Sequence, residues 1–105
     1  MTDQELLELA AKAVGASLTP LNCIWNDKIA EFVEWNPLVN DGDAFRLAAK
    51  LHMCVSITPS GTNVTKHNKD YYEVTSGSEQ AHGDPYEATR RAIVRAAAAI
   101  GKTID

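Results

Sequence analysis

Residues 35–51, WNPLVNDGDAFRLAAKL, decide the fold that the rest of the chain must accommodate. Pro37 lacks a backbone N–H and biases the residue before it toward an extended conformation, so it ends whatever strand precedes it. Asn40 or Asp41 then caps a helix, and Asp43 in the first turn places negative charge where the helix dipole favours it. The stretch therefore predicts a strand end, a tight polar corner and a helix that reaches residue 51.

Length and composition indicate one globular domain over residues 1–105, with 45% hydrophobic residues and a formal charge of −4. The acidic balance argues against coating of DNA, which depends on clustered lysine and arginine. No apolar run is long enough to cross a bilayer, and the N-terminus lacks a signal-peptide pattern. We therefore expect a cytoplasmic protein whose cysteines, Cys23 and Cys54, are reduced thiols.

The N-terminal third predicts a helix followed by a hairpin. Thr2 and Glu5 form a capping box for a helix over residues 3–14, which Gly15 ends. Residues 23–25 and 29–35 then form two strands around a polar turn. A helix over residues 27–34 is a rival interpretation, but the aromatic and β-branched content favours a strand.

The second half predicts further strands and a long final helix. Residues 54–58 alternate as a strand, 59–62 form a turn, 64–65 extend a return strand and 71–75 form a clearer strand. Residues 76–83 are small and polar, so we expect a mobile loop there. Asp84 caps the last helix, with Pro85 at its first position and Glu87 completing a capping box. Gly101 is expected to end this helix.

The predicted fold class is α+β, with the order α-β-β-α-β-β-α in a single domain. Short connections favour about four mainly antiparallel strands with the helices packed on the sheet. No internal repeat or domain boundary interrupts residues 1–105.

Asp41 and Asp43 raise the question of a metal site. An EF-hand loop with its glycine at Gly42 would begin at Pro37 and end at Ala48, and neither residue can be a ligand. Helix capping is the preferred role of these aspartates, and a weak Mg²⁺ site is the alternative.

A catalytic site is not expected. His52, His67 and His82 lack partners at metal-ligand or catalytic spacing, and the chain has no phosphate loop, nucleophile elbow or Cys-x-x-Cys pair. His52 and Cys54 remain a Cys–His alternative, since such pairs form in space. We predict no catalytic residue, no metal and no cofactor.

Surface contacts are the more promising function. A basic stripe along the last helix can meet nucleic acid or an acidic protein, and it consists of Arg90, Arg91, Arg95 and Lys102. Such stripes usually form the solvated side of a helix. Large amphipathic rings at Trp25, Trp35, Tyr71 and Tyr72 are suited to interfaces as well as to a core. The residues that we expect to contact a partner are Trp35, Asn36, Asp41, Asp43, Tyr72, Arg90, Arg91 and Arg95.

Two motifs together resemble the phage ABA-sandwich domain family. They are the WNPL, DGDA and RLA segments within residues 35–48 and the run DPYEATRRAIVRAAA over residues 84–98. The chain departs from the family pattern at Phe45 and in the polar turn over residues 66–69. The resemblance implies an α/β/α layered sandwich and a phage or prophage accessory protein made in the host bacterial cytoplasm. It implies no established activity and no catalytic residues.

Three functions follow as hypotheses. The first is a non-enzymatic domain that binds a host or phage protein, with self-association into a homodimer as a separate expectation. The second is a nucleic-acid or nucleotide binder that uses Arg90, Arg91 and Arg95. The third is a small hydrolase built on Asp41 and Asp43 with His52 or Cys54.

Overall fold

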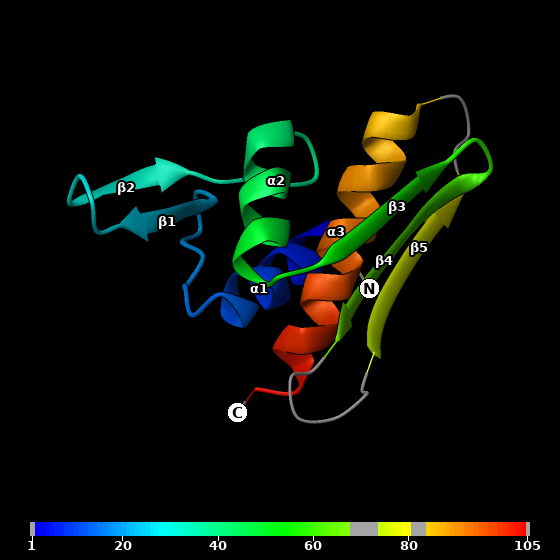
Figure 1. Cartoon of the computed structure of the whole chain (residues 1–105). Coiled ribbons are helices and arrows are strands. Elements are labelled where there is room, and N and C mark those ends of the chain that lie inside the picture. Colours follow the sequence, from blue (N-terminus) through cyan, green and yellow to red (C-terminus); the bar gives the residue numbers. More distant parts are fainter. Residues whose placement is uncertain (1, 68–73, 81–83, 105) are drawn as a thin grey trace.

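The computed structural model describes residues 2–67, 74–80 and 84–104, which form three helices and five strands (Figure 1). The helices are α1 (Asp3–Ala13), α2 (Asp41–Lys50) and α3 (Pro85–Lys102). The strands are β1 (Cys23–Asn26), β2 (Glu31–Glu34), β3 (Cys54–Thr58), β4 (Gly61–His67) and β5 (Val74–Gln80). The α+β class, the order of helices and hairpins and the antiparallel pairing are confirmed. The strands are divided between two sheets, because β1 and β2 pair only with each other among the described strands.

Side chains cap each helix at the predicted place. Thr2, Asn40 and Asp84 each accept a hydrogen bond from a backbone N–H of the first helical turn. Between the two alternatives at the start of α2, Asn40 is therefore the cap. Gly15 follows α1 with a φ of 75°, which confirms the predicted stop.

Gly101 does not end α3, so that prediction is wrong: the helix continues to Lys102. The missing side chain serves a helix crossing instead. A Cβ atom at position 101 would overlap the Leu9 carbonyl oxygen and lie 2.8 Å from the Leu9 carbonyl carbon. Glycine at this position lets α1 and α3 approach to backbone contact.

The first hairpin confirms the strand interpretation, because β2 occupies Glu31–Glu34 and a turn occupies residues 27–30. The helical alternative for residues 27–34 is wrong. β1 and β2 pair antiparallel from Cys23↔Glu34 to Asn26↔Glu31. This hairpin, called the arm below, projects from the body of the molecule beside α2 (Figure 1).

The second sheet has the order β3-β4-β5 and is antiparallel throughout. The expected loop over residues 76–83 is wrong for residues 76–80, which belong to β5. Their low intrinsic strand propensity is overridden because β5 pairs with β4 along seven residues, from Gly61↔Gln80 to His67↔Val74. Residues 81–83 and most of the strand expected at 71–75 lie outside the described residues.

α3 covers one face of the β3-β4-β5 sheet, and α1 and α2 pack against α3 (Figure 1). Thr62 and Val64 of β4 are buried beneath α3, whereas Ser56 and Asn63 on the other face are exposed. This alternation gives the β3–β4 hairpin a buried face toward α3 and an exposed polar face. The arrangement differs from the α/β/α layering that the resemblance implies, since the described helices gather on one side of the sheet.

Candidate functional site

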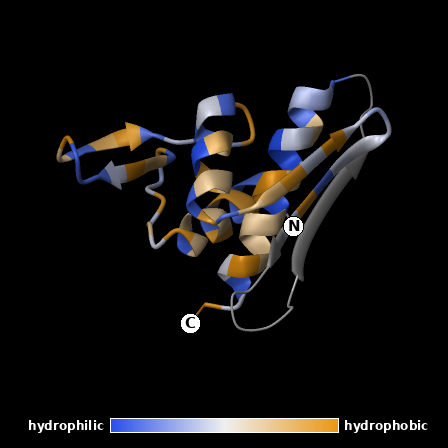
Figure 2. Cartoon of the chain, viewed as in Figure 1, coloured by the Kyte–Doolittle hydropathy of each residue, from blue (hydrophilic) through white to orange (hydrophobic). Residues whose placement is uncertain are grey.

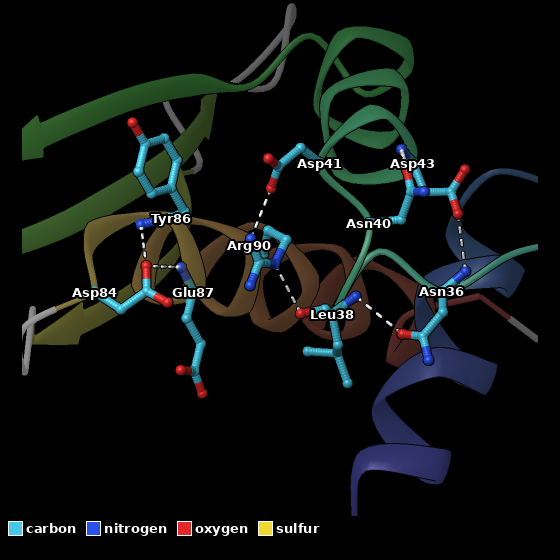
Figure 3. Close-up of polar contacts among 9 residues, drawn as sticks. All are labelled: Asn36, Leu38, Asn40, Asp41, Asp43, Asp84, Tyr86, Glu87 and Arg90. Carbon is cyan, nitrogen blue, oxygen red and sulfur yellow. Dashed lines mark hydrogen bonds and ion pairs between the residues drawn. The ribbon is translucent and has the colours of Figure 1, made fainter.

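The corner between β2 and α2 is a structural joint held by its own polar groups (Figure 3). The backbone N–H of Asn36 donates to Asp43 Oδ2 at 2.9 Å, and Asn36 Oδ1 accepts the N–H of Leu38 at 3.1 Å. Asp43 is buried, and its other oxygen pairs with Arg46 Nη2 at 2.7 Å. Both Asp43 oxygens are therefore occupied by contacts that shape the corner.

Trp35 and Leu38 anchor this corner in the core. Trp35 is 7% exposed, and Leu38 is buried in the same apolar cluster. Trp35 was expected either to fill the core or to contact a partner, and its burial assigns the indole ring to the core. Phe45 in the following helix has the opposite placement, because it is 72% exposed.

The two aspartates considered for catalysis are not brought together with His52 and Cys54. Asp41 and Asp43 lie in the first turn of α2, whereas His52 and Cys54 follow its last turn. A helix of this length separates its two ends by about 15 Å. Among the described residues, no group of three or more His, Cys, Asp or Glu side chains is arranged to hold a metal ion.

The basic stripe of α3 is divided between two sides of the helix. Arg90 donates through Nε to the Leu38 carbonyl at 2.9 Å and pairs through Nη1 with Asp41 Oδ1 at 2.6 Å (Figure 3). Arg91 turns toward α1 and pairs with Asp3 Oδ1 at 3.0 Å. These two arginines therefore tie α3 to other parts of the fold, and Arg95 is exposed further along the helix. Tyr72, the remaining expected contact residue, lies outside the described residues.

A groove of about 710 Å³ lies between α2, β3 and α3. Its lining is mainly apolar, and the residues in its floor come from all three elements and from the turn before β3. The residues of the floor are Ala44, Ala48, Met53, Val55 and Ile93. Alanine on α2 leaves this space open, because a small side chain there cannot reach β3.

Three large side chains with apolar surface stand around this groove and remain open to solvent. Phe45 of α2 is 72% exposed, Ile57 of β3 is 60% exposed and Tyr86 of α3 is 69% exposed. Asp41 and Arg90, which form an ion pair, supply polar groups to the lining. Contiguous apolar surface with a polar border is typical of a site that binds another molecule. We call this surface, floor and rim together, the α2–β3–α3 groove.

A second exposed apolar surface lies on the arm. Trp25 of β1 and Phe32 of β2 are cross-strand partners, with ring centroids 5.2 Å apart in an edge-to-face arrangement. They are 49% and 60% exposed, respectively. Ile24, on the other face of the arm, packs against the core and holds the base of the hairpin. Figure 2 shows hydrophobic residues on the arm, which projects outward from beside α2.

Sequence reasoning did not identify the groove. Phe45 was noted only as a departure from the pattern of the resemblance, although helical spacing puts it at the flank of the apolar face of α2. Tyr86 falls on the apolar face of α3 by helical spacing. An aromatic residue at the edge of a helix's apolar face was the one signal in the sequence that could have indicated a binding surface. The gap between α2 and β3 was not predictable in this way, because it depends on how the elements pack.

No family model, curated protein or solved structure matches the chain. Among the described residues, no helix combines the length and the apolar character needed to cross a membrane.

Proposed function

We propose that this chain is a non-enzymatic protein-binding domain, and that it serves as a small phage or prophage accessory protein in the host bacterial cytoplasm. The phage origin is supported by the sequence resemblance alone. Protein binding is supported by one observation of the structure. Phe45, Ile57 and Tyr86 come from three different elements and surround a single apolar groove while remaining mostly exposed.

The physical reason is the cost of leaving this surface in water. Exposed apolar area contributes about 25 cal/mol per Å² when another surface covers it. Large rings also lose little conformational entropy on binding, which favours them as anchors. The groove suits a segment of a host or phage protein that presents two or three large apolar side chains.

The polar groups nearest the groove fit a binding role better than a chemical one. Asp41 and Arg90 neutralise one another, and Arg90 also holds the Leu38 carbonyl. Thr89 shares a hydrogen bond of 2.9 Å with Thr62 of β4. These contacts fix the walls of the groove, and a rigid wall reduces the entropy lost when a partner docks.

Site-specific photocrosslinking in bacterial cells tests this proposal. A photoreactive residue at position 45 lies on the groove, whereas the same residue at position 56 lies on the polar face of the sheet. We expect a discrete adduct with a second kind of protein from position 45 and none from position 56. Identical adduct patterns from the two positions would remove the groove as the contact surface.

Nucleic-acid binding through Arg90, Arg91 and Arg95 is the alternative proposal. The ion pairs of Arg90 with Asp41 and of Arg91 with Asp3 weaken it, because each neutralises a charge that phosphate would need. A mobility shift with DNA or RNA at low salt, lost as salt rises, would favour this alternative.

A further inference from the structure

The arm has the features of a ligand rather than those of a core element. Its two aromatic rings are exposed, whereas Ile24, the neighbour of Trp25 on the opposite face of β1, contacts the core. Trp25 Nε1, the only donor of the indole, gives its hydrogen to Asp27 Oδ1 at 2.6 Å. The indole N–H therefore already has an acceptor, so covering the ring leaves no unsatisfied donor on Trp25.

We infer that the arm of one copy docks in the α2–β3–α3 groove of a second copy, and that the exchange is reciprocal, so that the protein forms a closed dimer. The inference rests on the proposed function, because it uses the same groove. It names a second copy of this chain as the occupant of the groove, in competition with any other protein. The arm does not fill the groove of its own chain, since none of its residues lines that groove.

The two surfaces match in chemistry. The arm presents two packed rings from adjacent strands, with their centroids 5.2 Å apart, as one wedge. The groove presents Phe45 of α2 and Tyr86 of α3 together with aliphatic lining residues. Edge-to-face contacts between aromatic rings add about 0.5–1.5 kcal/mol beyond the burial of area. Two rings of the arm packed against these two rings would allow several such contacts.

The strand edges match as well. β2 and β3 are both edge strands, and no described strand pairs with the outer edge of either. Just beyond the arm, the Trp35 N–H donates to the Asn22 carbonyl, so these two residues form a hydrogen-bonded pair. Hydrogen-bonded and non-hydrogen-bonded pairs alternate along an antiparallel ladder, so the backbone N–H and C=O of Phe32 point away from β1. An open edge of this kind readily pairs with a strand from another chain. Pairing of β2 with β3 of the other copy would seat Phe32 over the groove.

The available area favours reciprocal exchange over a single contact. Aromatic side chains bury about 150–250 Å² each when fully covered. Multiplying these areas by the exposed fractions of the aromatic residues, and adding smaller contributions from two isoleucines, gives about 600 Å² of surface covered by one arm in one groove. The aromatic residues are Trp25, Phe32, Phe45 and Tyr86, and the isoleucines are Ile29 and Ile57. That is typical of weak contacts, whereas specific interfaces bury about 1,200–2,000 Å². Two equivalent contacts reach this range, and twofold symmetry closes the assembly.

Sedimentation velocity over a range of protein concentrations tests the inference with the full chain. We expect a monomer–dimer equilibrium for the wild type. Trp25→Ser with Phe32→Thr on the arm, and separately Phe45→Glu in the groove, should each weaken the dimer by at least about 30-fold, the effect of losing an interface hot spot. These side chains are exposed in the monomer, so the variants should keep their helical circular dichroism. Ile104→Ser, which changes an exposed residue outside both surfaces, is the matched control and should leave the dimer unchanged.

Tryptophan fluorescence gives a second readout. Trp25 is half exposed in the monomer and Trp35 is buried, so dimerisation should protect Trp25 from acrylamide as the protein concentration rises.

A wild type that remains monomeric at millimolar concentration overturns the inference, as does a dimer that survives both the arm and the groove variants. These outcomes are separable from the proposed function. A monomer that still gives a position-45 adduct with another protein refutes only the dimer. A dimer whose position-45 adducts contain this chain alone refutes only the binding of a different protein.

Discussion

Replacing Gly101 with alanine tests the close crossing of α1 and α3. The new Cβ atom would overlap the Leu9 carbonyl oxygen and lie 2.8 Å and 3.2 Å from the Leu9 carbonyl carbon and Cα. All three atoms belong to the backbone of α1, so no side-chain rotation can relieve the overlap. α1 must instead move away from α3, which opens the contact that buries Leu6, Leu7 and Ala10.

Two terms of opposite sign set the magnitude. Alanine is favoured over glycine inside a helix by about 1 kcal/mol. Overpacking against a rigid neighbour costs about 1–3 kcal/mol and sometimes more. Backbone overlap places Gly101→Ala at or above the upper end of that range, so we expect a net loss of about 2 kcal/mol or more. A domain of this length has about 5–15 kcal/mol of stability, and the variant should therefore fold with a reduced margin.

Urea denaturation followed by circular dichroism measures this loss. With an m value of about 2 kcal/mol per molar urea, the midpoint should fall by about 1 M. Gly42→Ala is the matched control, because its Cβ would meet the end of the flexible Arg46 side chain at 3.2 Å and the Asn40 Oδ1 atom at 3.3 Å. We expect Gly42→Ala to change the free energy of unfolding by less than about 1 kcal/mol, because the end of the Arg46 side chain is exposed and can shift. Equal midpoints for the two variants would refute the close α1–α3 approach.

Three further substitutions have expected outcomes. Trp35→Ala should destabilise by about 3–5 kcal/mol, measured by urea denaturation, because it empties a buried site at the corner; retained stability with loss of partner binding would reverse this assignment. His52→Gly should stabilise by about 0.5–1 kcal/mol in thermal unfolding, since His52 has a φ of 54° in the helix-ending position that Gly15 occupies after α1; no gain would show that this backbone costs histidine nothing. Asp84→Ala should lower the free energy of unfolding by about 1 kcal/mol through loss of the cap of α3, and Asp84→Asn should restore most of it.

Local signals in the sequence determined most of the secondary structure. The caps at Thr2, Asn40 and Asp84 and the stop at Gly15 depend on hydrogen bonds and dihedral angles within a few residues, so each was recognisable without a fold. The structural interpretation of the corner at Trp35 rested on the same local chemistry. The α+β class followed from the order of these elements.

Long-range packing decided what the sequence did not predict. β5 forms because β4 offers a complete pairing partner, although its own residues resemble a loop. Gly101 was predicted to end the helix, but glycine is required there because the Leu9 backbone of α1 leaves no room for a Cβ atom. The sequence around Gly101 does not show that contact. The division of Arg90 and Arg91 between two acidic partners likewise depends on where α1 and α2 meet α3.

The candidate site also depends on long-range packing. Phe45, Ile57 and Tyr86 are far apart in the chain, and each is unremarkable in its own element. They surround one groove only because α2 and β3 both pack against α3 without filling the space between them. The sequence by itself determined the capped corner at residues 35–51, because its interactions are local. The tertiary structure alone decided that the helix beginning there forms one wall of an apolar groove.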